Sequence, residues 1–114
     1  MPQPDSLLLE HMLQALDRIE ELLARTTRGE FERDWVVQDA LIRELEIIGE
    51  AAGRVSFDLA QAHPEVPWKE ITGLRHKLIH DYFAVDLGIV WKTAEKEAAE
   101  VRPLIEKALE ALKE

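Results

Sequence analysis

The sequence predicts an all-α fold, a small antiparallel bundle of about four to five helices. Three features of the sequence support this prediction. Apolar residues recur every three or four positions almost throughout the 114 residues, no stretch alternates convincingly with a period of two, and caps or breakers divide the chain at intervals. Since no repeat, low-complexity segment or linker interrupts the pattern, residues 1–114 are expected to form one domain.

The first half of the chain predicts two long helices. The first should begin near Asp5 or Ser6, because either side chain can accept hydrogen bonds from the free amides of a first turn. It should end by Arg28–Gly29, where glycine can adopt the left-handed conformation of a helix cap. The second helix is expected over residues 32–55, with apolar residues repeating along one face.

The second half of the chain begins with a short helical turn that Ser56 caps and that extends to Ala62. The segment "HPEVP" (63–67) must end this turn, because two prolines three residues apart cannot continue a helix. Its second proline suits the first position of a helix over about 68–83. Asp86 can cap the last helix, which should run to the C-terminus and bend at Pro103.

Composition excludes several classes of protein. The net charge of −9 argues against a general nucleic-acid binder, although one stretch could supply a local basic patch: Lys69, Arg75, His76, Lys77 and His80. The absence of cysteine excludes disulfides and thiolate metal sites. No apolar run approaches the ~20 residues that span a bilayer, and "MPQPDS" is unlike a signal peptide. A cytoplasmic protein without a membrane partner is expected.

The stretch "GLRHKLIHDYF" (73–83) gathers two of the four histidines and the single tyrosine. On a straight helix, which turns about 100° per residue, Arg75 and Tyr82 would share the apolar, inward face. His76 and His80 are four residues apart and would lie together on the outward side. This pair could bind zinc, but Asp81 is the only nearby candidate for a further ligand, so no metal or other cofactor is expected.

Glu44 is anomalous because it falls within the apolar face of the second predicted helix. A carboxylate in a core costs several kcal/mol unless it is paired. An inward-facing arginine needs a partner for the same reason, so the sequence suggests a buried Glu44–Arg75 ion pair. The alternative is that Glu44 lies at the edge of an interface and reaches water.

Together these residues resemble the HEPN superfamily and, within it, the HepT-like toxins of bacteria and archaea. The motif of that family is an arginine, a polar residue, three further residues, a histidine, one residue and a tyrosine. Arg75, His76, His80 and Tyr82 take those places here. The likeness extends from about Asp34 onward, through "LEIIGEAAGRV", "HPEVPWKEITGLR" and "VDLGIVW". His76 stands where the family often has asparagine, which adds a titratable group.

The resemblance implies a HEPN-like homodimer of helical protomers whose motif helices lie close to the two-fold axis. His80 would then face the partner subunit. It also implies a metal-independent ribonuclease toxin with RNA as substrate. Its antitoxin would be a small nucleotidyltransferase, and Tyr82 would be the hydroxyl that this antitoxin modifies with AMP.

The chemistry of RNA cleavage fits the residue types. A histidine can move a proton near neutral pH, so His80 is expected as general base or acid. Arg75 can grip phosphate with two parallel hydrogen bonds, but if Glu44 holds it, His76 or Lys77 would contact the phosphate instead. A second hypothesis is a non-catalytic HEPN subunit that delivers substrate to a nucleotidyltransferase or forms a complex with it, which the acidic surface would suit.

Overall fold

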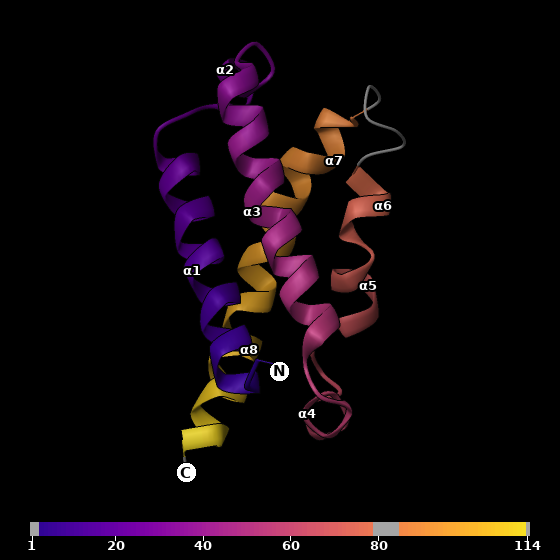
Figure 1. The fold of residues 1–114 in the computed structure, drawn as a ribbon. Coiled ribbons are helices and arrows are strands. Elements are labelled where there is room, and N and C mark those ends of the chain that lie inside the picture. Colours follow the sequence, from indigo (N-terminus) through magenta and orange to yellow (C-terminus); the bar gives the residue numbers. More distant parts are fainter. Residues whose placement is uncertain (1–2, 79–84, 114) are drawn as a thin grey trace.

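The computed structural model describes residues 3–78 and 85–113, and the elements in these ranges are helices. Four arms form the bundle (Figure 1). They are α1 (Asp5–Ala24), α3 (Trp35–Arg54), the pair α5 (Trp68–Thr72) and α6 (Leu74–Leu78), and a last arm. The last arm comprises α7 (Leu87–Lys92), the π-helix η1 (Thr93–Glu97) and α8 (Ala98–Lys113), while the short helices α2 (Arg28–Phe31) and α4 (Phe57–Ala62) flank α3. The all-α prediction is confirmed.

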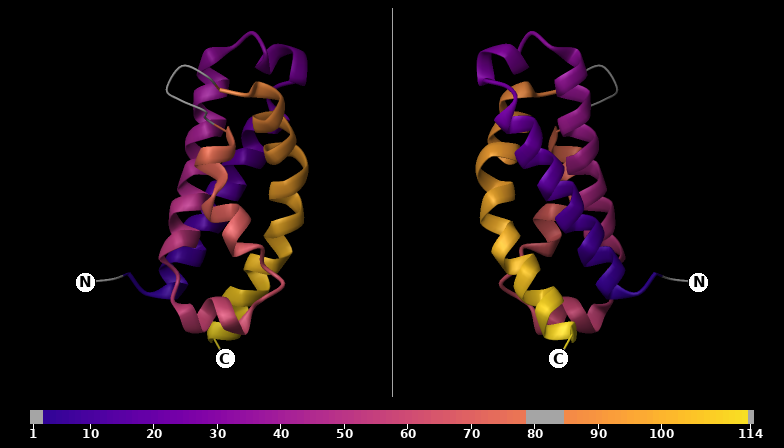
Figure 2. Two further views of the ribbon diagram at one scale, coloured as in Figure 1. Left: turned by 90° about the vertical axis from the view of Figure 1, so that its right-hand side faces the viewer. Right: turned by 90° about the vertical axis from the view of Figure 1, so that its left-hand side faces the viewer.

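Apolar faces of these arms meet in one core. Helix α1 packs against both α3 and α8, and α3 packs against α5 and α6. Viewed from the side, α5 and α6 lie between α3 and the last arm (Figure 2, left). The side chains that are most fully buried are Phe31, Leu8, Leu9, Met12, Ile19, Leu41, Leu45, Leu78, Ile105, Val66 and Val90. No helix within the described ranges is both long and apolar enough to cross a membrane.

Side-chain caps set several helix starts. Ser56 Oγ accepts from Leu59 N at 3.1 Å, and Asp86 Oδ1 accepts from Ile89 N at 3.0 Å, as the sequence predicted. Asp5, however, does not cap α1. Its carboxylate accepts from the backbone N of Ser56 at 2.8 Å and from Ser56 Oγ at 2.6 Å, so it joins the start of α1 to the corner between α3 and α4.

Two boundaries differ from prediction because a local cap lies elsewhere. Helix α1 ends at Ala24 rather than near Gly29, and the Thr27 side chain caps the separate α2 by accepting from Glu30 N at 3.2 Å. Helix α3 begins at Trp35 rather than at residue 32, because Asp34 Oδ1 accepts from Val36 N at 3.0 Å.

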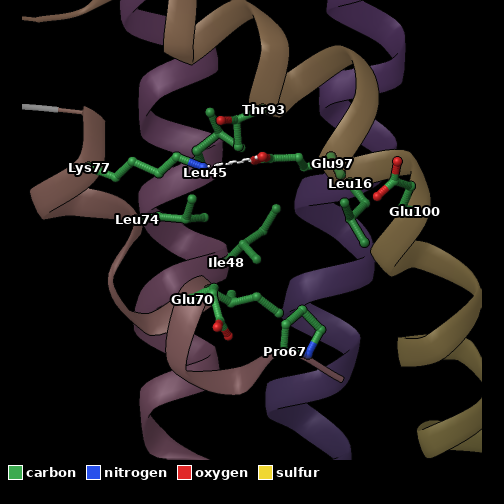
Figure 3. A pocket seen from close by; sticks show the side chains of 12 residues that line it. Leu16, Leu45, Ile48, Pro67, Glu70, Leu74, Lys77, Thr93, Glu97 and Glu100 are labelled. Atoms are coloured by element: carbon green, nitrogen blue, oxygen red, sulfur yellow. Dashed lines mark hydrogen bonds and ion pairs between the residues drawn. The ribbon is translucent and has the colours of Figure 1, made fainter. Parts of the chain in front are cut away.

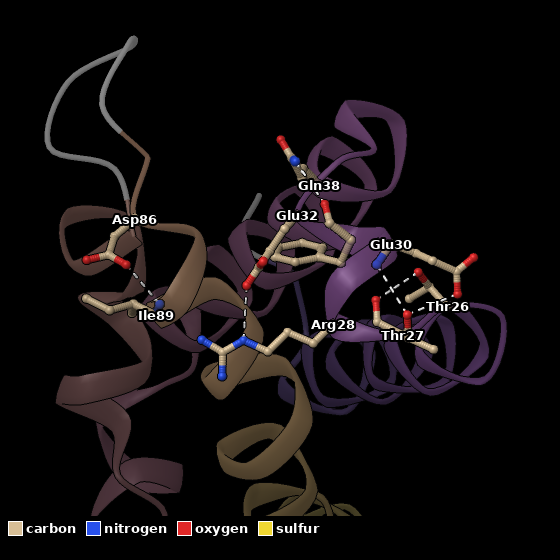
Figure 4. A network of polar contacts seen from close by, with 9 residues as sticks. Thr26, Thr27, Arg28, Glu30, Glu32, Gln38, Asp86 and Ile89 are labelled. Carbon is tan, nitrogen blue, oxygen red and sulfur yellow. Dashed lines mark hydrogen bonds and ion pairs between the residues drawn. The ribbon is translucent and has the colours of Figure 1, made fainter.

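At one end of the bundle, contacts among α2, α3 and α7 hold the start of α7 in place (Figure 4). Phe31 is fully buried, and its ring centroid lies 5.3 Å from that of Trp91. Gln38 Nε2 donates to the carbonyl oxygen of Phe31 at 2.9 Å, which ties α2 to α3. Together with the Asp86 cap, these contacts hold the start of α7 next to α2 and α3.

The last arm is not a uniform helix. Ala98 N donates to Thr93 O, five residues back, which is the π-helical pattern. Pro103 lies within α8, and the bend that the sequence predicts there stays a prediction. Arg102 fixes α8 to α1 with bonds of 2.8 Å to Asp17 and of 2.8 Å to Glu20. Burial lowers the pKa of this guanidinium, but the two carboxylates raise it by more, so the pKa lies above its ordinary value.

A close approach of α3 and α5 positions the motif. A Cβ placed on Gly49 would lie 3.0 Å from the carbonyl oxygen of Ile71, tighter than nearly all real contacts of this kind. At Gly53 the nearest atom would be the Thr72 Cγ2, at 3.4 Å. Glycine at position 49 therefore lets the backbones of α3 and α5 approach each other, and this brings α6 alongside α3.

Candidate functional site

Helix α6 carries the first part of the motif. Arg75, His76 and Lys77 are all exposed, while Leu74 and Leu78 anchor the helix in the core with 8% and 0% of their surface exposed. The outward orientation expected of His76 is therefore confirmed. His80 and Tyr82 lie outside the described residues, so their predicted positions are not tested.

Arg75 and His76 line a surface groove between α3 and the α5–α6 arm. This groove, called the α3–α6 groove below, has a volume of about 460 Å³. Thr72 also lines it, and α3 contributes the other five residues: Glu46, Gly49, Glu50, Gly53 and Arg54. These five positions follow the spacing i, i+3, i+4, i+7 and i+8, so one stripe of α3 forms a whole wall.

Each guanidinium in the groove already has a carboxylate partner. Arg75 Nη1 lies 3.5 Å from Glu46 Oε2, and Arg54 Nη2 donates to Glu50 Oε1 at 2.7 Å. The side chains of Arg75 and Arg54 are 73% and 60% exposed. Exposed ion pairs of this kind contribute about 0–1 kcal/mol. A phosphate can therefore replace the carboxylates at small cost, because its geometry matches a guanidinium equally well.

The predicted Glu44–Arg75 ion pair is wrong. Glu44 is buried, as its place in the apolar face suggested, but its nearest cation is Arg18 of α1, with Nη1 and Oε1 3.8 Å apart. Glu44 Oε1 accepts no hydrogen bond from the residues that the structure describes. Arg75 instead pairs with Glu46, two residues further along α3.

The inward orientation predicted for Arg75 is also wrong, and the cause is local. The prediction assumed one straight helix over about residues 68–83, on which Arg75 falls within the apolar face. In the structure Gly73 separates α5 from α6 with φ −82° and ψ 2°, away from helical values. The buried face of α6 then rests on Leu74 and Leu78 alone, and Arg75 falls outside it.

Lys77 faces a different hollow from its two neighbours. Its Nζ lies 3.2 Å from Glu97 Oε1 and 3.1 Å from Oε2, across a pocket between α6 and η1 (Figure 3). The structure therefore brings Arg75 and His76 together in the α3–α6 groove, and it places Lys77 and Glu44 elsewhere.

Sequence reasoning missed Arg54, Glu46 and Thr72. A signal for the first two was present, because "EIIGEAAGR" places charged residues and glycines along one helical stripe where a core-facing helix would be apolar. Thr72 could not be found in this way, since only the packing of α5 on α3 brings it into the groove.

Comparisons with known proteins agree with the motif. Residues 12–108 match the family described as Ribonuclease HepT-like. "Probable ribonuclease HepT" of Thermococcus cleftensis is 40% identical over 99 residues, covering 87% of this chain and 90% of that protein. "Putative RNase TTE0752" of Caldanaerobacter subterraneus subsp. tengcongensis is 40% identical over 102 residues, covering 90% and 91%. "Putative RNase MJ0125" of Methanocaldococcus jannaschii is 37% identical over 115 residues, covering 100% and 99%.

No solved structure shows significant similarity to this chain. The match to the family description covers most of the chain, and the three relatives align over nearly their whole lengths. The chain belongs to the Ribonuclease HepT-like family.

Proposed function

We propose that this chain, as one domain over residues 1–114, is a metal-independent endoribonuclease that binds RNA in the α3–α6 groove. The observation that carries the proposal is the exposure of Arg75 and His76 side by side in one groove with Arg54. RNA phosphates could take the places of Glu46 and Glu50 on these two guanidiniums, which would give an acidic chain a local means of binding RNA. The family and the names of its relatives supply the reaction class.

The proposed reaction is attack of the ribose 2′-oxygen on the adjacent phosphorus. A general base takes the 2′-hydroxyl proton, and a general acid protonates the departing 5′-oxygen, which leaves a 2′,3′-cyclic phosphate on one product. His80 fills one of these proton-transfer roles by its place in the motif. Arg75 stabilises the charge of the phosphorane, and because Glu44 does not hold it, its guanidinium is accessible for this role.

The other groove residues have supporting roles. His76 and Arg54 contact neighbouring phosphates, while Glu46 orients the Arg75 guanidinium until RNA replaces it. Lys77, which the sequence made a candidate phosphate contact, is engaged by Glu97 in the other hollow. The proposal therefore gives the phosphate contacts to Arg75, His76 and Arg54 rather than to Lys77.

The test is cleavage of a labelled RNA by the full-length chain with and without EDTA. His80→Ala should abolish cleavage and leave the circular dichroism spectrum unchanged, whereas His11→Ala, a histidine of α1 outside the groove, should cut like the wild type. Cleavage should persist in EDTA. Full activity of His80→Ala, or loss of wild-type cleavage in EDTA, would contradict the proposed mechanism.

We infer that the active form is a homodimer with the α6 helices near its two-fold axis. The exposure of His76 supports this arrangement, because an imidazole on the outer side of α6 is free to face a second copy. Light scattering at micromolar concentration should give twice the monomer mass. A monomer would count against the inference, and so would a dimer whose α6 helices cannot be cross-linked through cysteines introduced at position 76.

We further propose that the chain is the toxin of a toxin–antitoxin pair in the cytoplasm, and that a nucleotidyltransferase antitoxin silences it by attaching AMP to Tyr82. The added phosphate would place negative charge close to Arg75 in sequence and compete with RNA for the guanidinium. Tyr82→Phe should cut RNA yet resist silencing by the cognate nucleotidyltransferase with ATP. Modification of this variant, seen by intact mass as an AMP-sized addition, would rule out Tyr82 as the acceptor.

The second candidate function is a non-catalytic subunit that binds a nucleotidyltransferase. The net charge of −9 favours it, because an acidic surface suits a basic protein better than RNA. The two functions separate in the cleavage assay. If the wild type leaves RNA intact and still forms a stable complex with the nucleotidyltransferase, the chain is a binding subunit.

A further inference from the structure

Trp35 differs from the other two tryptophans because it has no part in the core. It is 69% exposed, whereas Trp91 is 7% exposed, and the indole of Trp68 donates to the carbonyl oxygen of His63 at 3.0 Å. Aromatic side chains contribute strongly to interfaces when they become buried there. A single apolar side chain on a surface needs no explanation by itself, so the position of Trp35 decides what it can do.

Helix α3 places Trp35 in line with the α3–α6 groove. Glu46 follows eleven residues later, which turns the helix by about 1100°, within about 20° of three full turns. Gly53 follows after eighteen residues, which is about five full turns. Both of these residues line the groove. Trp35 therefore lies on the groove side of α3, about 16 Å from Glu46 along the helix axis.

The α5–α6 arm runs antiparallel to α3. Thr72 is the side chain nearest to a Cβ placed on Gly53, and Arg75, three residues later, pairs with Glu46, seven residues earlier. Helix α6 therefore advances toward the start of α3, where Trp35 lies (Figure 1). A nucleic-acid strand that Arg75 holds by a phosphate and that continues in this direction along α3 would reach the indole.

The surface between Trp35 and the groove carries charges of both signs. Arg43 is exposed and pairs with no carboxylate in the part of the chain that the structure describes. Asp39, one turn earlier, is also exposed and has the opposite charge. Because these charges offset each other, stacking must supply most of the affinity here. Stacking of one base on an aromatic side chain contributes about 5- to 150-fold in affinity, whatever the base.

We propose that Trp35 stacks on an unpaired base of the RNA strand whose phosphate Arg75 holds, so that the substrate class is single-stranded RNA. This inference rests on the proposed ribonuclease function. Inside a duplex both faces of each base are covered by its neighbours, so a paired base offers the indole no face. A stacked strand rises by about 3.4 Å per nucleotide, so this base belongs to a nucleotide a few positions from the cleaved bond.

Tryptophan fluorescence of the full-length chain tests the stacking without cleavage. The probe is a short oligonucleotide with 2′-O-methyl groups throughout, which has no free 2′-hydroxyl to attack the phosphorus. The single strand should quench the fluorescence, and the same sequence as a blunt duplex should not. Trp35→Phe should remove the quenching, because the two remaining tryptophans are not on the groove side of α3. Equal quenching by strand and duplex, or undiminished quenching of the variant, would overturn the proposal.

Kinetics supply the second test. Trp35→Ala should raise KM for single-stranded RNA about 5- to 150-fold and leave kcat within about twofold, because stacking far from the cleaved bond stabilises ground state and transition state equally. Trp35→Phe should recover part of the loss. The matched control is Phe57→Leu, since Phe57 is an aromatic side chain of α4 that is 75% exposed at the other end of α3, and its KM should equal that of the wild type.

Light scattering separates RNA from a second copy of the chain as the partner of Trp35. The Trp35→Ala variant should keep the mass of the wild type, and a smaller mass would assign the indole to a subunit contact and overturn the proposal. An unchanged KM of Trp35→Ala would also overturn it while leaving the ribonuclease intact. If the wild type leaves RNA uncut, the proposed function fails, and quenching by the uncleavable strand still decides whether Trp35 stacks on a base.

Discussion

The two sides of α6 differ in how their polar groups are satisfied. In the α3–α6 groove, Arg75 and Arg54 are exposed and each already pairs with a carboxylate. In the pocket between α6 and η1 the floor is aliphatic and the Thr93 hydroxyl is buried without a partner in the described chain. The groove is therefore suited to exchange one anion for another, whereas the pocket is an aliphatic hollow beside a hydroxyl that is closed to solvent. Adjacent residues of one short helix face these two environments because each residue turns the helix by about 100°.

The largest expected effect is on RNA cleavage, and it should differ between variants of Arg75 and of Lys77. Arg75→Ala should lower RNA cleavage by at least about 100-fold, because it removes a positive charge from the developing phosphorane. Lys77→Ala should change cleavage by less than about threefold, because its ammonium is engaged by Glu97 on the other side. Single-turnover cleavage rates measure both. Since Arg75 is 73% exposed, its variant should also keep the wild-type melting temperature within about 2 °C. Similar losses in the two variants would remove the distinction between the sides.

The next effect tests the packing that creates the groove. Gly49→Ala should lower the free energy of unfolding by about 1–3 kcal/mol, because the new Cβ would lie 3.0 Å from the backbone oxygen of Ile71 and force α3 and α5 apart. Gly53→Ala is the matched control in the same helix. Its nearest contact would be a side-chain methyl at 3.4 Å, so the better helix propensity of alanine should leave stability equal or raise it by up to about 1 kcal/mol. Urea unfolding distinguishes them, and equal stability would show that the close approach is unimportant.

A smaller effect concerns the unused hydroxyl of the pocket. Thr93→Val should raise the free energy of unfolding by about 1 kcal/mol, because it replaces a buried, unpaired polar atom by a methyl group of similar size. Thr93→Ser keeps the hydroxyl and loses the methyl, so it should be destabilising by about 1 kcal/mol. Thermal and urea unfolding measure both changes. A valine variant less stable than the wild type would mean that the hydroxyl has a stabilising partner.

The smallest expected effect on stability is that of the ion pair between Lys77 and Glu97. The side chains of Lys77 and Glu97 are 46% and 36% exposed. A double-mutant cycle with Lys77→Met and Glu97→Gln should therefore give a coupling free energy below about 1 kcal/mol. This coupling should fall further at high salt. A larger, salt-independent coupling would indicate that the pair holds α6 against η1.

Features that depend on local sequence were predictable. Ser56 and Asp86 cap the helices that follow them because a cap needs only the next three residues. The start of α3 was misplaced by three residues, although Asp34, which caps the helix, is the one residue of 32–34 whose type is a preferred N-cap. The partner of Glu44 was not predictable, because α1 brings Arg18 close to it only in the assembled bundle. The same holds for Arg75, whose orientation changed with a break at the single residue Gly73.

The break at Gly73, which separates α6 from α5, has a consequence for how the site opens. Within the described residues, Leu74 and Leu78 are the side chains that hold α6 in the core. The amide protons of α6 should therefore exchange with solvent through a local opening of lower free energy than that of the 20-residue α3 beside it. Arg75 and His76 would leave the groove in each such opening without unfolding of the bundle.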